Sequence, residues 1–297
     1  MTSIVDHGGV IGALQRRSDA LGLLAILRDW VIIASTIAIA EWAASPSVTL
    51  LAIWVIGSQQ YALGEVLVHE ASHRNVFASY RLNERLQFLF AWPLLTTVRA
   101  YRKSHAPHHI DLGGPADPIS ARYSSLQHGF NRWSVARVWL LEPLFGFASI
   151  RYLRDDVLAE PWTTLAPGLA INAAIALGCA FAGRIDLFIM YWVIPYVWVF
   201  PAFYHWQELE DHFGCVGEGR VSVGRLRNFL HHNSGFHHVH HTWPNVPFFN
   251  LRSAFRFVDI PHADISTGFW GTYRALCQHA ERTRIDPHTT SFGGARS

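Results

Sequence analysis

Histidine is the residue type whose number and spacing in this chain could carry chemistry. The chain has 18 histidines among 297 residues, and imidazole is the commonest metal ligand among side chains. Eight of them have HxxxH or HxxHH spacing within three short motifs, HEASH, HAPHH and HHVHH. Residues three or four positions apart lie on one face of a helix, so each motif can direct its imidazoles at one metal ion. In order along the chain, these histidines are His69, His73, His105, His108, His109, His237, His240 and His241.

This number of imidazoles predicts more than one metal ion. Zinc sites close at about four ligands, so eight clustered histidines exceed what a single ion can hold. Nitrogen ligands exclude magnesium and calcium, whereas zinc, copper and iron all accept imidazole. The motifs therefore predict a site for two metals, and by themselves they leave the identity of the metal open.

A low content of charge predicts that part of the chain faces lipid. Hydrophobic residues make up 50% of the sequence and charged residues 15%, whereas average soluble domains carry about 25% charge. The segment Val48–Val68 would be about 31 Å long as a helix, which matches a hydrocarbon core of about 30 Å. Together with three other apolar segments it predicts four transmembrane helices. The predicted spans are 30–44, 48–68, 162–183 and 187–203.

Short connections join these spans into two helical hairpins. The predicted fold is an all-α integral membrane protein, a single domain over residues 1–297, with a cytoplasmic helical cap that holds the dimetal site. Residues 86–98 are apolar but too short to cross a bilayer and contain Pro93, which predicts a re-entrant or interfacial segment. Residues 286–297 are predicted to form a disordered tail.

The distribution of basic residues predicts the orientation in the membrane. Of the 24 lysines and arginines, the two hairpin connections contain only Arg184. By the positive-inside rule, both termini are expected in the cytoplasm, which in a bacterium means an inner-membrane protein. An even number of crossings then places all three histidine motifs on the cytoplasmic side.

Net charge and cysteine content exclude two other classes of protein. A formal net charge of +2 gives no basic surface of the kind that binds nucleic acid. Three scattered cysteines, Cys179, Cys215 and Cys277, are too few for a disulfide framework or for a cysteine-based zinc site.

The three motifs, in this order and with a hairpin between the second and third, resemble the membrane-bound fatty acid desaturase and hydroxylase superfamily. The resemblance covers roughly Leu51 to Leu251, and the segment HNSGFHHVHHTWPNVP is similar to the family's third motif region. It implies two iron ions as cofactor, O2 as co-substrate and a lipid acyl chain as substrate. It also implies a further metal ligand after the last span, a position that His212 occupies in QELEDHF.

The resemblance favours a fatty acyl desaturase. A hydroxylase, an acetylenase and a carotenoid hydroxylase or ketolase use the same motifs, so these activities stay open. Two further functions are weaker alternatives. HEASH also matches the HExxH pattern of zinc proteases, in which Glu70 would be the base, but that pattern leaves six histidines without a role. A metal transporter would need polar ligands near the bilayer midplane, where the two later spans offer little beyond Asn172.

Four further residues are candidates to support the ligands from outside the metal's coordination sphere. Glu65 lies one helical turn before His69, and the others surround the last span and the third motif. The four candidates are Glu65, His205, Glu208 and Asn233. No role is predicted for His231, His232 and His238. Ordinary surface positions are expected for His7, His128, His262, His279 and His288.

The enzyme is expected to need a separate electron donor. The sequence has no glycine-rich dinucleotide fingerprint, no set of four cysteines for an iron–sulfur cluster and no HPGG haem motif. A ferredoxin, a rubredoxin or a cytochrome b5 type carrier, with its reductase, is the expected partner. An acidic carrier could be attracted by Arg99, Arg102, Lys103, Arg225 and Arg227.

Overall fold

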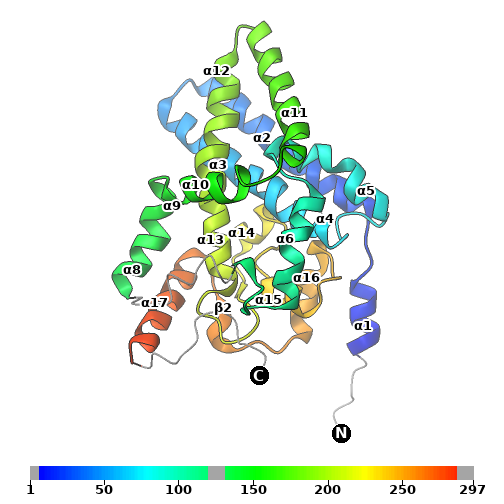
Figure 1. The fold of residues 1–297 in the computed structure, drawn as a ribbon, viewed down its shortest axis with the longest axis vertical. Helices are drawn as coiled ribbons and strands as arrows, with labels where there is room; N and C mark the ends of the chain where they lie inside the picture. Colours follow the sequence, from blue (N-terminus) through cyan, green and yellow to red (C-terminus); the bar gives the residue numbers. More distant parts are fainter. Residues whose placement is uncertain (1–6, 120–130, 286–297) are drawn as a thin grey trace.

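Four long helices dominate the molecule (Figure 1). The structure is a computed structural model, and it describes residues 7–119 and 131–285. In this described part, four helices are long and apolar enough to cross a membrane, as predicted. The four run over Asp19–Ala43, Pro46–Ser72, Trp162–Phe181 and Ile185–His212.

The second and fourth of these helices contain π-helical turns. The second consists of α3 (Pro46–Tyr61), a π-helical segment at Ala62–Leu67 and α4 (Val68–Ser72). The fourth consists of α12 (Ile185–Phe188), two π-helical segments at Ile189–Val193 and Pro195–Val199, and α13 (Phe200–His212). The first and third are α2 (Asp19–Ala43) and α11 (Trp162–Phe181). Such turns are frequent at functional sites, and the one at residues 62–67 directly precedes the first histidine motif.

The first helix begins at Asp19, whereas the apolar pattern predicted a start at Trp30. The predicted start lies at Trp30 because Arg28 and Asp29 directly precede it, and charged side chains are unfavourable in a helix that faces lipid. Asp29 is fully buried, and its carboxylate lies 2.7 Å from both Arg28 and His232. Because the partner from the third motif region cannot be seen in the local sequence, the apolar pattern does not show that the helix begins at Asp19. The position of the membrane span within this helix stays a prediction.

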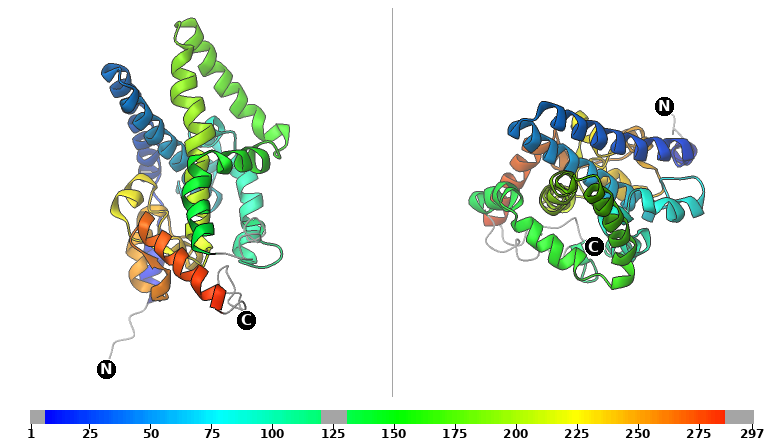
Figure 2. Two further views of the ribbon diagram at one scale, coloured as in Figure 1. Left: turned by 90° about the vertical axis from the view of Figure 1, so that its left-hand side faces the viewer. Right: turned by 90° about the horizontal axis from the view of Figure 1, so that it is seen from above.

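Both hairpins turn tightly at the same end of the molecule. Ala44 adopts a left-handed conformation with φ of 45° and ends α2, and Pro46 then begins α3. Gly183 turns the second hairpin with φ of 69°, which glycine adopts without strain. In Figure 2 both tips lie at one end, and α16 (Phe248–Ala254) and α17 (Phe269–Ile285) lie at the other.

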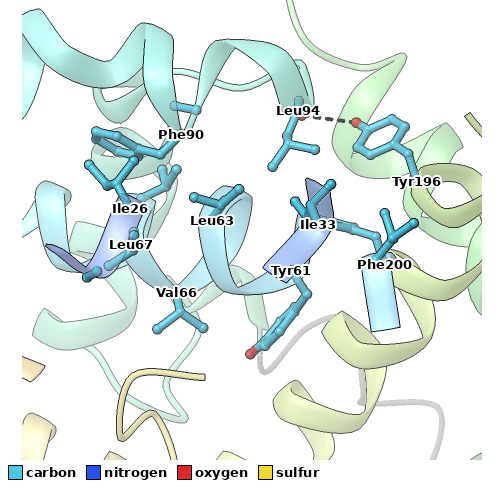
Figure 3. Close-up of a cluster of buried hydrophobic side chains, with 14 of the residues drawn as sticks. Ile26, Ile33, Tyr61, Leu63, Val66, Leu67, Phe90, Leu94, Tyr196 and Phe200 are labelled. Atoms are coloured by element: carbon cyan, nitrogen blue, oxygen red, sulfur yellow. Dashed lines mark hydrogen bonds between the residues drawn. The ribbon is translucent and has the colours of Figure 1, made fainter. Parts of the chain in front are cut away.

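The two hairpins pack through a shared apolar core (Figure 3). Gly57 allows α3 to approach the fourth helix closely, since a Cβ atom there would lie 2.4 Å from Cβ of Val199. The hydroxyl of Tyr196 donates to the carbonyl of Leu94 at 3.0 Å. Other side chains in this core are Ile26, Ile33, Tyr61, Leu63, Leu67 and Phe200. This packing fixes the end of the second helix, which carries the first histidine motif.

Residues 86–98 do not form a regular helix. They contain two short 3-10 turns, Leu86–Leu89 and Trp92–Leu94, with Pro93 buried in the second. The turns pack against α11, where the amide of Asn172 donates to the carbonyl of Pro93 at 3.0 Å and accepts from the indole of Trp192. Asn172 is therefore used in helix packing. A position of residues 86–98 at the membrane interface stays a prediction.

Short elements form the predicted cap. Its helices are α1 (His7–Leu14), α5 (Tyr80–Arg85), α6 (Val98–Ile110), α8 (Arg132–Ala136), α9 (Glu142–Leu144), α10 (Phe147–Tyr152), α14 (Arg225–Leu230) and α15 (His237–Thr242), together with α16 and α17. Single π-helical or 3-10 turns lie at Arg137–Leu141, Leu153–Val157, Phe255–Phe257 and His262–Asp264. Two short strands, β1 (Val221–Ser222) and β2 (Ile265–Ser266), pair in parallel, with Val221 opposite Ile265. The tail predicted at residues 286–297 lies outside the described residues.

Candidate metal centre

Nine histidines from four separate helices converge into two groups. In each group the potential ligand nitrogens all lie within 4.8 Å of one another. The first group is His69, His73, His105, His109 and His240, and the second is His108, His212, His237 and His241. These are the nine residues proposed as ligands from the sequence, so the fold brings the whole predicted set together.

Each helix presents its histidines because of their spacing along it. Helix α4 carries His69, and His73 ends that helix with their rings 5.0 Å apart. Helix α6, which packs against α4, carries the second motif, and its start is fixed by Thr97, whose hydroxyl caps the helix. The short helix α15 carries the third motif. His212, the last residue of α13, completes the second group.

The distances between the ring nitrogens match those expected for atoms that bind the same metal ion. Two nitrogens each about 2.0–2.1 Å from one metal lie about 3 Å from each other when roughly at right angles. Nε2 of His109 lies 2.9 Å from that of His105 and 3.2 Å from that of His240. In the second group, Nε2 of His212 lies 2.9 Å from that of His108 and 2.8 Å from that of His237.

Two further nitrogens have no other use in the described part of the chain. The buried Nε2 atoms of His69 and His73 have no hydrogen-bond partner among the described residues. A buried polar atom without a partner is costly, and coordination to a metal removes that cost. The residues present therefore fit two metal ions held by imidazole.

Several of the histidines are in the protonation state that binds metals. The pKa of His73 is lowered to about 4, mainly by burial and then by Arg102 and His108, and the pKa of His109 is lowered to about 3, mainly by burial and then by His73 and His108. Burial also brings the pKa well below the usual range for His105, His237, His240 and His241. Neutral imidazole is the metal-binding form, so protons do not compete with a metal ion near neutral pH.

Two carboxylates and one backbone carbonyl lie close to the Nδ1 atoms of three of these rings. Nδ1 of His108 lies 3.0 Å from Oδ1 of Asp117, and Nδ1 of His237 lies 3.2 Å from Oδ2 of Asp211. Nδ1 of His212 donates to the carbonyl of Glu218 at 3.0 Å. Such contacts leave Nε2 free to bind the metal and fix the orientation of the ring.

Sequence reasoning missed these supporting carboxylates. Two local features could have indicated them. Asp211 directly precedes the proposed ligand His212, and Asp117 lies in the loop after the second motif. Glu70 has a similar position between two rings of the first group. Its Oε1 lies 3.7 Å from Nδ1 of His69 and 3.9 Å from Nδ1 of His240, and its Oε2 accepts from the amide of Phe248.

The four predicted supporting residues have different surroundings. Glu65 accepts a hydrogen bond from the hydroxyl of Tyr101 at 2.5 Å, and the Tyr101 ring lies 5.4 Å from that of His105. His205 belongs to neither group, because its nitrogens lie 2.9 Å from the carbonyl of Val138 and 3.0 Å from Arg151.

The other two candidates are Glu208 and Asn233. Glu208 is buried and lines the cavity described below. Asn233 has a left-handed conformation with φ of 58°, and its side chain donates to the carbonyl of Phe248 at 3.0 Å. Asn233 therefore shapes the turn before the third motif and does not bond to a histidine ring in the contacts described.

The remaining histidines lie outside both groups. His231, His232 and His238 are buried and lie within 2.8 Å of Ser58, 2.7 Å of Asp29 and 3.1 Å of the carbonyl of Gly219, respectively. His262 is exposed, as expected.

The expectation for His279 was wrong. It is buried, with its ring 5.6 Å from that of Phe213, because α17 packs its inner face against the end of α13. The side chain of His7 and all of His128 and His288 lie outside the described residues.

A cavity of about 140 Å³ adjoins both histidine groups. Its lining includes ligand candidates of each group, together with Tyr61, Glu65, Tyr101, Tyr204 and Glu208. None of its described lining residues comes from residues 86–98.

Replacing Asp117 by asparagine should weaken metal binding by the second group about 10- to 100-fold, since supporting carboxylates typically contribute that much. Titration of the metal-free protein with Fe(II) against a competing chelator measures this effect. Asp111→Asn is a matched control, because its carboxylate accepts from the amide of Ala116 in the same loop. An equal loss in both variants would contradict the role given to Asp117.

Comparisons with known proteins agree with this geometry. The model of the family described as fatty acid desaturase matches residues 24–260. The chain is 25% identical to a dihydrorhizobitoxine desaturase of Bradyrhizobium elkanii, over 87% of this chain and 81% of that protein. It is 22% identical to an sn-1 oleoyl-lipid 12-desaturase of Arthrospira platensis, over 82% and 78% of the two chains. It is 24% identical to an sn-1 acyl-lipid omega-3 desaturase (ferredoxin) of Synechocystis sp., over 68% and 65%. The chain belongs to the fatty acid desaturase family.

Proposed function

We propose that this protein is an O2-dependent di-iron desaturase that introduces a double bond into a lipid acyl chain. The observation that carries the proposal is the convergence of nine histidines into two compact groups. The names of two relatives, an oleoyl-lipid and an acyl-lipid desaturase, support an acyl chain as substrate. The reaction converts CH2–CH2 into CH=CH while O2, two electrons and two protons become two molecules of water.

The two groups would each hold one iron ion. His69, His73, His105, His109 and His240 would bind the first ion, and His108, His212, His237 and His241 the second. When bound, the irons supply the reductive activation of O2 that removal of hydrogen from an unactivated C–H bond requires.

The protein's own residues orient and shield this site. Asp117 and Asp211 accept from the Nδ1 side of His108 and His237 and so direct Nε2 inward. Burial of most of these rings excludes bulk water. The adjoining cavity offers a place for the substrate carbon beside both groups.

The alternative of a zinc protease receives no support from the position of Glu70. A general base must reach the metal-bound water, whereas the Glu70 carboxylate faces the Nδ1 edges of two rings and the amide of Phe248. The transporter alternative loses its candidate midplane ligand, because Asn172 bonds to Pro93 and Trp192.

Lipid profiling tests the activity directly. Expression in a host that lacks the activity should give acyl chains two mass units lighter than the saturated precursor, detected by mass spectrometry. The same host expressing His240→Ala is the control and should show no such product. A product sixteen mass units heavier would identify a hydroxylase and contradict desaturation.

We also propose that both termini and the metal centre are cytoplasmic. The four apolar helices and the family support a membrane protein, and the near absence of basic residues at the hairpin tips supports the orientation. Reporters fused at Arg184 and after Ser297 should report opposite sides of the membrane. Matching signals from the two positions would contradict this arrangement.

A further inference from the structure

A second pocket, of about 400 Å³, opens beside the first histidine group. Three arginines, Arg17, Arg74 and Arg102, line it, and no acidic residue does so among the described residues. His73 also lines the pocket. The pocket is therefore a basic hollow that reaches a proposed metal ligand.

This pocket and the cavity described above touch different members of the first group. His73 lines the basic pocket, whereas His69, His105 and His240 line the other cavity. The histidine group thus lies between the two spaces. A donor at the basic pocket and a substrate in the other cavity would therefore approach this group from different sides.

The arginines are held in place by neighbouring groups. Nε of Arg17 donates to Asn75 at 3.3 Å, and the guanidinium of Arg74 lies 4.2 Å from the centre of the Tyr80 ring. Arg102 donates to the carbonyl of Ser72 and pairs with Glu84 at 2.8 Å. Positive charge at the pocket therefore comes mainly from Arg17 and Arg74.

The basic surface expected from the sequence is a different one, and it stays a prediction. Two of the five residues proposed there are engaged internally, because Arg102 pairs with Glu84 and Arg227 pairs with Glu210, each at 2.8 Å. Arg227 is only 19% exposed. The basic hollow next to His73 involves Arg17 and Arg74, which the sequence did not single out.

We propose that the pocket lined by Arg17, Arg74 and His73 is the docking site of the electron donor, a small carrier protein with an acidic surface. The proposal rests on the proposed function. The reduced carrier gives up one electron at each encounter, so two encounters supply the two electrons that a turnover takes from outside. Acidic side chains of the carrier would pair with the two arginines, which places its redox group near His73.

Charge reversal of either arginine tests the proposal. With plant-type ferredoxin as the carrier, Arg74→Glu and Arg17→Glu should each lower kcat/KM for ferredoxin about tenfold, mainly through KM, because rim charges act on encounter. Arg74→Lys should retain activity close to that of the wild type. Added salt should weaken the wild type more than the reversed variants.

The matched control is Arg137→Glu, a reversal of a half-exposed arginine. Arg137 begins the segment between α8 and α9, which lies on the opposite side of the molecule from α5, where Tyr80 lies (Figures 1 and 2). A loss for Arg137→Glu as large as for Arg74→Glu would overturn the proposal, since it would reveal a general effect of charge.

Two further measurements separate this proposal from the proposed function. Calorimetry with oxidised ferredoxin and iron-loaded protein should show about tenfold weaker binding for Arg74→Glu, whether or not the enzyme turns over. Turnover driven by dithionite and a small dye should be equal in the wild type and Arg74→Glu. Unchanged ferredoxin binding in Arg74→Glu would overturn the docking site, whereas absence of dithionite-driven turnover in the wild type would overturn the proposed function.

Discussion

Replacing His109 or His240 by alanine is expected to reduce turnover to background. The two rings come from different motifs, yet their Nε2 atoms lie 3.2 Å apart in the same group. Either substitution removes a proposed ligand of the first iron and leaves a gap in the first group. Iron content should fall from two ions to about one per chain, because the second group keeps all of its ligands. Activity assays and elemental analysis on the same preparation measure both effects.

The control for this prediction lies within the same motif. His238 follows His237 directly, but its Nδ1 lies 3.1 Å from the carbonyl of Gly219 and it belongs to neither group. Its replacement by glutamine should leave two irons per chain, as should replacement of the exposed His262 by alanine. If His238→Gln still folds but loses as much iron as His240→Ala, the assignment of histidines to the two groups is wrong.

Purified protein supplied with NADPH and O2 alone is expected to be inactive, with turnover appearing only after a reductase and a carrier are added. The described residues contain a single pair of two-residue strands, so they hold no strand–helix unit for a dinucleotide. The three cysteines are free, and an iron–sulfur cluster takes four. The name of one relative includes ferredoxin, which supports this carrier as the donor to try.

Reconstitution measures this dependence as product formed per minute in the presence and absence of each component. Omitting either the reductase or the carrier should return the rate to background, and boiled carrier serves as the control. Sustained turnover with NADPH alone would mean that the chain contains a redox module of its own.

Eight of the nine histidines in the two groups were predictable from local spacing, whereas His212 was assigned from the resemblance to the family. An i, i+3 or i+4 pair faces one side of any helix, so HEASH, HAPHH and HHVHH identify their own candidate ligands. The grouping was not predictable. His108 belongs to the second group, whereas its neighbours His105 and His109 belong to the first. Which ring faces which ion depends on how α6, α13 and α15 pack.

The features that were missed depend on contacts between distant parts of the chain. Asp29 is tolerated in the first helix because of His232, some 200 positions away in the sequence. His279 is buried by Phe213. Asp117 acts through His108 only because the loop after α6 folds back onto that ring. Single-sequence patterns contain none of these pairings.

Measurement of the metal content tests directly whether the two histidine groups hold two iron ions. The protein should be purified after iron loading under anaerobic conditions, and iron, zinc and copper should be measured against protein concentration by elemental mass spectrometry. We expect two irons per chain, with activity proportional to iron content. One metal ion per chain, or full activity with zinc in place of iron, would contradict this expectation.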